Sequence, residues 1–259
     1  MSSVEILTAN ARMWRSVQAD ELPPQYWMLG VVVPLLFRSL VYVLLGRMIA
    51  GQAGLDWTYV GAVFLAITGS TISHTSDVPI YDVWFRTYPA VSRAAAPVVL
   101  QYLARTGVLA ARAFVEAIVV CVVIGLLVDS PAHVLSVLRH SWTLLPALAA
   151  CIAFGLAIIA PAIGNDSQDL IHNTAGTLVI LTSGALLTPG AAPWLHILGG
   201  VLPLQHALDA MRASLAGRSP WPGVAGELLV ATGWLLVAAI AYRIVDHRTR
   251  SSGRGAMQG

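Results

Sequence analysis

Long apolar runs alternate with short polar segments along most of the chain. A bilayer core about 30 Å thick requires about 20 mostly apolar residues in a helix. The pattern therefore predicts six transmembrane helices, and tryptophans near several of the proposed ends suit interfacial anchors. The spans are expected over residues 27–49, 57–73, 107–128, 142–164, 173–189 and 222–245, and the tryptophans are Trp27, Trp57, Trp142 and Trp221.

The segment before the first span has the pattern of an amphipathic helix. Apolar residues recur at helical spacing, at Val4, Leu7, Ala11, Trp14 and Val17. The pattern predicts an interfacial helix over residues 1–22, which the prolines of "ELPPQ" would end. The alternative is a frayed chain terminus.

A second amphipathic segment, "LGGVLPLQHALDAMRASLAGRSPWPG", stands between the fifth and sixth spans. Pro203 suits the first turn of a helix, and Gly217 is placed to end it. One face carries the apolar residues Leu204, Ala207, Leu208, Met211 and Leu215, and the opposite face carries Gln205, His206, Asp209 and Arg212. Asp209 and Arg212 are i and i+3 neighbours. We expect a short helix at, or dipping into, the outer leaflet.

The composition agrees with the spans. Of 259 residues, 57% are hydrophobic and only 11% are charged, against roughly 25% charged in soluble domains. All fifteen basic residues are arginines, which excludes a P-loop lysine and Schiff-base chemistry on lysine. Cys121 and Cys151 stand alone in apolar runs and are expected to be small buried hydrophobes, with their redox state left open. The first hydrophobic helix, rather than a cleavable signal peptide, is expected to direct insertion.

The arginines predict the orientation. Ten fall on the side of the termini and four on the other, so the positive-inside rule predicts that both termini are cytoplasmic. The ten are Arg12, Arg15, Arg86, Arg93, Arg105, Arg112, Arg243, Arg248, Arg250 and Arg254; the four are Arg47, Arg139, Arg212 and Arg218. The chain is then one all-α domain over residues 1–259, with the bundle over 27–245 and a cytoplasmic basic tail over 246–259.

The cytoplasmic loop from Ser76 to Pro97 is the first candidate functional segment. Large aromatics beside an arginine suit a protein interface; alternatively, the aromatics lie among lipid headgroups. The candidate residues are Asp77, Tyr81, Asp82, Trp84, Phe85 and Arg86.

Two charges, Arg38 and Glu116, fall near the middle of the first and third spans. A charge at that depth costs at least about 2.5 kcal/mol, so each needs a partner or a wet cavity. They either line a translocation path, or Glu116 pairs with Arg112 while Arg38 snorkels or meets another chain. Glu227, early in the sixth span, is expected to be interfacial.

The remaining polar residues indicate no catalytic or metal chemistry. The seven histidines lack metal-ligand spacing, and no nucleophile motif is present. Asp166 and Asp169 are expected to cap a helix and to be solvated. We expect no metal or cofactor in this chain, and no nucleic-acid partner.

The segment "LTSGALLTPGAAPWLHILGGVLPLQHALDAMRASLAG" resembles the region after the fifth span in ABC-2 type exporter permeases, especially the multidrug or daunorubicin-resistance-like branch. The matching positions are Pro203, Leu204, Arg212 and Gly217. The order of an interfacial helix, six spans and two inner termini is also similar over essentially the whole chain. The loop between spans two and three departs from the family, which usually has a glutamate and a G-T-L-like stretch where this chain has Phe85, Arg86, Thr87 and Tyr88.

This resemblance implies a non-enzymatic permease subunit of an ABC exporter in the cytoplasmic membrane. Two copies of an ATP-binding cassette subunit would bind ATP and Mg and would contact a coupling helix in the loop, while a second permease copy or a paralogue completes the dimer. The cargo would be amphipathic or hydrophobic: a drug, a natural product or a lipid. The alternatives are an ABC-2 exporter of lipid-linked polysaccharide, an ion-coupled secondary transporter, and a scaffold that transports nothing.

Overall fold

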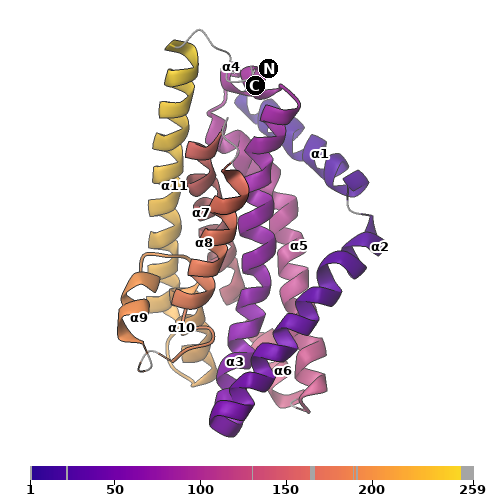
Figure 1. Cartoon of the computed structure of the whole chain (residues 1–259), viewed down its shortest axis with the longest axis vertical. Helices are drawn as coiled ribbons and strands as arrows, with labels where there is room; N and C mark the ends of the chain where they lie inside the picture. The colour runs from indigo at the N-terminus through magenta and orange to yellow at the C-terminus, as the bar shows by residue number, and fades with distance from the viewer. Residues whose placement is uncertain are drawn as a thin grey trace.

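The computed structural model is helical, without strands, over the residues it describes, which are 2–21, 23–129, 131–163, 167–188, 190 and 192–251. The long helices run along one axis of the bundle, and α1 crosses beside one end (Figure 1). The helices are α1 (Ser3–Glu21), α2 (Pro24–Trp27), a π-helical segment (Met28–Val32), α3 (Val33–Trp84), α4 (Tyr88–Arg93), α5 (Val98–Leu127), α6 (Pro131–Arg139), α7 (Leu144–Ile159), α8 (Gln168–Thr182), α9 (Pro193–Gly199), α10 (Gln205–Leu215) and α11 (Trp221–Ser251), with 3-10 turns at Ser141–Thr143 and Ala160–Ala162.

Helix α3 consists of two arms. Its backbone leaves the helical region at Ala50 and at Gly51, where φ is +61°. Figure 1 shows the first arm descending from α2 and the second arm returning along the bundle axis. A Cβ at Gly46 would collide with the Thr58 side chain, and a Cβ at Gly54 with the Gly46 carbonyl. Small residues therefore let the two arms meet closely beside the turn.

Four helices of the described chain are long and apolar enough to cross a membrane: Gln25–Trp84, Val98–Leu127, Ser141–Ala162 and Trp221–His247. The first contains both arms of α3, and so both of the first two expected spans. Helix α8 has 15 residues; it begins at Gln168, five residues before the expected fifth span, and ends at Thr182, seven residues before the end expected for it. These helices confirm an all-helical membrane protein.

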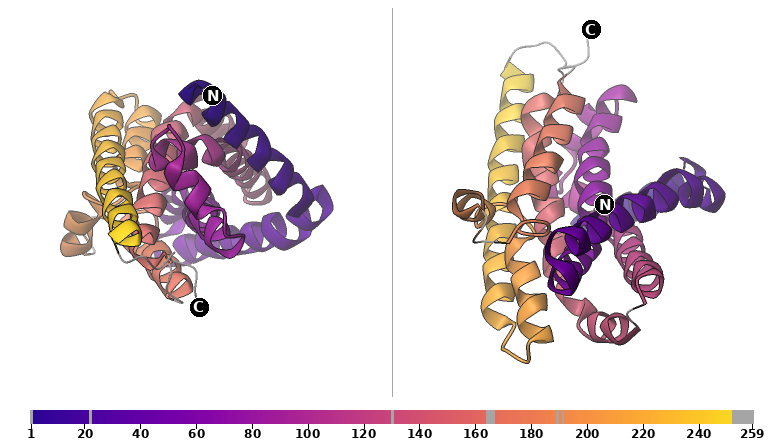
Figure 2. Two further views of the ribbon diagram at one scale, coloured as in Figure 1. Left: turned by 90° about the horizontal axis from the view of Figure 1, so that it is seen from above. Right: turned by 60° about the horizontal axis from the view of Figure 1, so that its bottom comes forward.

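Helix α7 lies at the centre of the bundle. The most apolar stretch of its span, Ser141–Ala162, is 83% buried, against 22% for the stretch in Trp221–His247. It packs against α3, α5, α8 and α11, and Figure 2 shows α11 alongside it. A helix that is apolar on all sides suits this enclosed position.

The N-terminal segment forms the expected helix, α1, and packs on α5. Trp14 is buried, and Leu7, Ala11 and Val17 are partly buried, but Val4 is 69% exposed. The inward face also holds the polar residues Asn10 and Gln18, which the apolar pattern did not indicate. Their hydrogen bonds to arginines of α5 explain their position.

We predict that Gly61→Val destabilises the chain. A Cβ at Gly61 in α3 would collide with the Ala185 carbonyl just after α8. Overpacking of this kind costs about 1–3 kcal/mol, so thermal unfolding in detergent should begin several degrees lower. Gly107→Val is the matched control, since a Cβ there meets nothing within 4 Å. Equal unfolding temperatures for the two variants would contradict the close α3–α8 approach.

Candidate functional site

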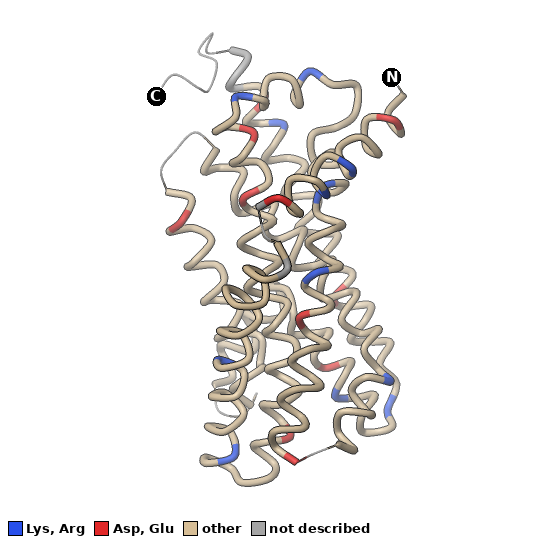
Figure 3. Tube along the Cα trace, turned by 90° about the vertical axis from the view of Figure 1, so that its right-hand side faces the viewer, with Lys and Arg blue, Asp and Glu red and all other residues tan. Residues whose placement is uncertain are grey.

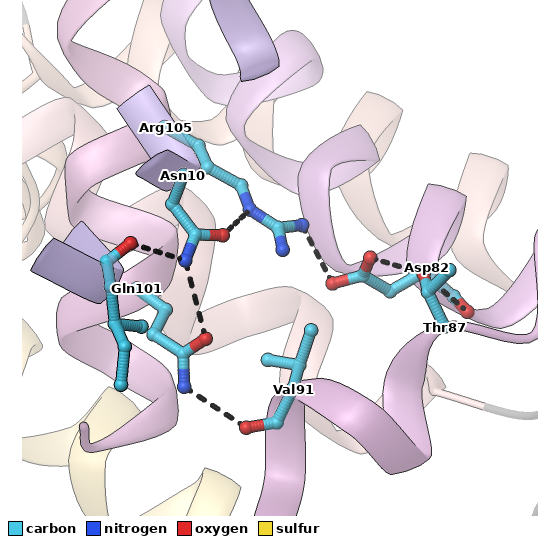
Figure 4. A network of polar contacts seen from close by, with 7 residues as sticks. Asn10, Asp82, Thr87, Val91, Gln101 and Arg105 are labelled. Carbon is cyan, nitrogen blue, oxygen red and sulfur yellow. Dashed lines mark hydrogen bonds and ion pairs between the residues drawn. The ribbon is translucent and has the colours of Figure 1, made fainter. Parts of the chain in front are cut away.

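A buried ion pair joins the end of α3 to α5. Arg105 Nη1 lies 2.7 Å from Asp82 Oδ2, and both side chains are almost fully enclosed. The Arg105 Nε group donates a second hydrogen bond, 2.7 Å long, to Asn10 Oδ1 on α1 (Figure 4). One guanidinium therefore connects three helices at this end of the bundle.

Further hydrogen bonds extend the pair into the loop around α4. Thr87 Oγ1 donates to Asp82 Oδ1 over 2.6 Å. Gln101 Nε2 donates to the carbonyls of Val91 and Ala96, at 2.9 and 2.8 Å, and Gln101 Oε1 accepts from Asn10. We call Asn10, Asp82, Thr87, Gln101 and Arg105 the inner network. Asp82, Gln101 and Arg105 are buried, Asn10 is partly buried and Thr87 is exposed, and the hydrogen bonds of the buried residues tie α4 to α1, α3 and α5.

Of the six residues expected at this loop, three are exposed and three pack against or bond to other residues of the chain. Trp84 and Phe85 are 62% and 67% exposed, and Arg86 is exposed. Tyr81 packs behind them, with its ring 5.6 Å from those of Trp14 and Trp84. Asp82 is buried in the inner network and so cannot be a surface contact, while Asp77 lies 3.5 Å from His74.

The exposed residues continue onto α4, where Ala90 and Arg93 face outward. We call Trp84, Phe85, Arg86, Ala90 and Arg93 the aromatic patch. Sequence reasoning named Trp84, Phe85 and Arg86 of this patch as interface candidates, because they are contiguous with a span end, but not Ala90 or Arg93. Sequence reasoning did not find the inner network, because Arg105 stands 23 residues from Asp82 in the sequence. Arg105 was counted only among the arginines on the side of the termini.

Most charged residues lie near the two ends of the bundle, and a few lie part-way along it (Figure 3). Glu116, on α5, is fully buried. Its carboxylate accepts hydrogen bonds from Trp27 Nε1, at 2.8 Å, and from Ser70 Oγ. The Glu116 carboxylate thus has hydrogen-bond partners on α2 and on the second arm of α3. These groups, rather than Arg112, satisfy it. Arg112 donates to Gln18 Oε1 and lies over the Trp27 ring.

Arg38, on the first arm of α3, is only partly buried. Its Nη2 atom lies 3.4 Å from where a Cβ of Gly69 would stand, and Gly69 is exposed. The Arg38 guanidinium therefore lies beside this exposed glycine, on an open side of the two arms.

Helix α8 carries a stripe of polar and small residues along one exposed or partly exposed face. Asp169, His172, Asn173, Gly176 and Thr177 recur at offsets 0, 3, 4, 7 and 8, and each is exposed or partly exposed. We call these five residues the α8 stripe. Sequence reasoning placed Asp169 before the fifth span and Asn173, Gly176 and Thr177 within it, but it did not recognise the stripe. Asp169 is exposed in the first turn as expected, whereas Asp166 lies outside the described residues.

On the other end of the bundle, α10 has the expected apolar stripe. Leu204, Ala207, Leu208 and Met211 are fully buried, and Gly217, with φ +68°, follows the last turn. The helix begins at Gln205 rather than at Pro203. It packs between α3, α6, α7 and α11 instead of lying on a surface. Its polar face is only partly enclosed, since Gln205 is buried but His206, Asp209 and Arg212 are partly exposed; His206 Nε2 lies 3.0 Å from the Gly200 carbonyl.

Two charged side chains hold α10 in place. Glu227 is fully buried, and its carboxylate accepts from the backbone N–H groups of Leu204 and Ala207 at 2.7 and 3.0 Å. It therefore caps the first turn of α10 from a buried position, and the interfacial depth expected for it stays a prediction. Arg212 stacks 3.4 Å above the Trp57 ring and donates to the Gly184 carbonyl over 3.0 Å.

Burial lowers the pKa of the Arg212 guanidinium to about 10, and nearby Asp209 opposes the shift. Arg212 is therefore still charged at neutral pH. Its hydrogen bonds go to carbonyls of Trp57 and Gly184 rather than to Asp209.

Among the described residues, no group of three or more His, Cys, Asp or Glu side chains is placed to hold a metal ion. Cys121 and Cys151 are free and buried.

The chain was compared with known protein families and with curated proteins. A family model described as ABC-2 type transporter matches residues 12–216, which extend from α1 to the end of α10. No curated protein matches the chain.

We predict that Arg105→Met strongly destabilises the inner end. It leaves the buried Asp82 carboxylate without its counter-charge, which costs about 3–5 kcal/mol. Adding Asp82→Leu should recover much of the loss, because no uncompensated charge then remains buried. Thermal unfolding in detergent measures both effects, with the exposed Arg93→Met as control. A double variant no more stable than the single variant would argue against the ion pair.

Proposed function

Because the chain belongs to the ABC-2 type transporter family, we propose that it is the membrane-spanning permease subunit of an ATP-driven exporter. In this proposal it moves an amphipathic or hydrophobic compound, such as a drug, a natural product or a lipid, out across the cytoplasmic membrane. The observation that carries the proposal is the exposed aromatic patch supported by the inner network.

The aromatic patch suits the docking of an ATP-binding subunit. Exposed Trp and Phe rings beside arginines are typical of protein interfaces. The patch rests on α4, which the inner network ties to α1, α3 and α5. A push on α4 would therefore move these helices together rather than bend the loop. The chain has no lysine, so we place the P-loop, ATP and Mg in a separate subunit present in two copies.

Six spans fit the bundle: the two arms of α3, then α5, α7, α8 and α11. An even number of spans returns the chain to its starting side, and α1, α4 and the later part of α11 lie at the same end in Figure 1. The arginine distribution favours the cytoplasm for that end. The long axis then crosses the membrane, with α10 on the outer side.

The α8 stripe and Arg38 support a translocation path. Polar groups facing lipid at this depth are costly, so such a face is normally turned to a wet cavity or another chain. Helix α8 packs against α3, whose exposed Gly69 lies under Arg38. We infer that a second permease copy, or a paralogue, covers this face and encloses the path between the two chains.

The first test of this function is co-purification from native membranes in mild detergent, followed by mass spectrometry. The chain should bring a stoichiometric subunit that contains a P-loop lysine. Trp84→Ala with Arg86→Ala should reduce that subunit at least about tenfold, since exposed aromatic and arginine contacts dominate many interfaces. Trp221→Ala with Arg218→Ala is the matched control, because it removes the same residue types at the opposite end.

Recovery of the chain alone across several detergents would contradict the ATP-driven assignment and favour ion-gradient transport. Unchanged association of the Trp84 and Arg86 variant would remove the aromatic patch from the interface.

The proposed path has a separate test. Asn173→Leu with Thr177→Leu should abolish stimulation of the complex's ATPase by a panel of amphipathic compounds, because the polar face of α8 becomes apolar. Association with the ATPase should be unchanged. Leu178→Ile with Leu181→Ile is the control, since these exposed leucines lie on the same helix outside the stripe. Normal stimulation in the Asn173 and Thr177 variant would place the path elsewhere.

A further inference from the structure

Helix α10 and the first two turns of α11 are packed as a single unit, which we call the outer hairpin. Glu227 on α11 accepts hydrogen bonds from the N–H groups of Leu204 and Ala207, at the start of α10. The two backbones approach closely, since a Cβ at Gly223 would stand 2.9 Å from Ala210 Cβ. A Cβ at Gly226 would stand only 3.0 Å from the His206 ring. These contacts leave little freedom for α10 to move relative to α11.

The start of the outer hairpin is conformationally strained. Leu204 has φ +94°, a region that non-glycine residues rarely adopt. The hydrogen bond to Glu227 and the complete burial of the Leu204 side chain maintain this conformation. A strained residue persists only where its surroundings fix it, so Glu227 is a rigid internal connection of the hairpin.

The contact of Arg212 with the rest of the bundle is of another kind. Its partners, Trp57 at the start of the second arm of α3 and Gly184 after α8, belong to other parts of the fold. The apolar contacts of Leu208 and Met211 with the core are non-directional, so they permit sliding. The stacked guanidinium and its hydrogen bonds fix both distance and angle.

This contact is strong but incomplete. Arg212 Nε and Trp57 Nε1 are buried without a hydrogen-bond partner among the described residues. Unsatisfied buried donors disfavour the state that buries them. The arrangement therefore combines a favourable stack with two polar groups that would gain water if the hairpin moved away.

We propose that the outer hairpin moves as one body and that Arg212 is the releasable clasp that sets its closed position against α3 and α8. Arg212 is thus a positioning residue for opening the outer side of the path. The terms outer and path rest on the proposed function, whereas the clasp itself is a property of this chain alone.

The test measures exposure of Met211, which is fully buried beside Arg212. A Met211→Cys reporter is placed in the full chain after Cys121→Ala and Cys151→Ala. A membrane-impermeant maleimide is applied to intact cells and to inverted vesicles. Arg212→Gln should raise the labelling rate about tenfold, because it removes a cation–π contact and hydrogen bonds from a charged donor. Arg212→Lys should also raise it, since an ammonium lacks the planar stacking surface.

Two controls separate the clasp from general loss of structure. Arg218→Gln removes the same charge from an exposed position of the turn after α10 and should leave labelling unchanged. Trp57→Phe keeps a ring and should preserve low labelling, whereas Trp57→Leu should match Arg212→Gln. Combining Trp57→Leu with Arg212→Gln should add little, because both remove one interaction. Unchanged labelling in Arg212→Gln, or fully additive effects, would overturn the clasp.

The single-body claim is tested by a disulfide between His206→Cys and Gly226→Cys. The Cβ of His206 and the Cβ position at Gly226 are 3.4 Å apart, close to disulfide geometry. Cross-linking should preserve the increase in labelling caused by Arg212→Gln. Loss of that increase would show instead that α10 separates from α11. These measurements need no ATPase subunit, so failure to find one would contradict the proposed function while leaving the clasp result intact.

Discussion

The structure depends on one constraint: a charge taken into the lipid interior must find its partner within the protein. The chain meets it with polar contacts between helices: Asp82 forms an ion pair, while Glu116, Glu227 and Arg212 bond to neutral donors or acceptors. Each buried or nearly buried charge bonds to an element other than its own: Asp82 to α5, Glu116 to α2 and α3, Glu227 to the start of α10, and Arg212 to α3 and the segment after α8. These polar contacts are directional, so they fix which helices are neighbours, whereas the apolar surfaces between them would tolerate sliding.

The constraint is met differently at the two ends of the bundle. At the end that carries α4, one ion pair and its hydrogen bonds join four elements beneath the exposed aromatic patch. At the end that carries α10, this helix is attached to α11 by Glu227 and to the bundle by Arg212. Between the ends, α7 is apolar on all sides and enclosed. In the proposed mechanism, a force applied to α4 would be carried by the packed helices of the bundle to the outer hairpin, which Arg212 holds against α3.

Local features of this fold were predictable because their causes are local. The apolar runs, the amphipathic pattern of α1 and α10, and the glycine after α10 all depend on residues within a few turns of one another. The pairing of Arg105 with Asp82 and the capping of α10 by Glu227 were not predictable, because each joins positions about 20 residues or more apart. Rules based on residue type lead one to expect that a carboxylate near a span end is exposed at the interface. Glu227 is buried instead, because two backbone N–H groups donate hydrogen bonds to it. The α8 stripe is an intermediate case. Its helical spacing can be seen in the sequence, but its polar residues do not suggest part of a membrane-spanning bundle.

The exclusive use of arginine has a physical consequence at three sites. Arg105, Arg112 and Arg212 each lie over an aromatic ring, of Tyr102, Trp27 and Trp57, and each also donates a hydrogen bond from the edge of the guanidinium. A planar group can present its face to a ring and its edge to an acceptor at the same time, which a compact ammonium cannot do. The ring contacts of Arg112 and Arg212 fix the orientation of one helix relative to another, whereas Arg105 lies over a ring of its own helix and reaches α1 and α3 by hydrogen bonds. A chain with few charges at membrane depth can hold its helices in register in this way.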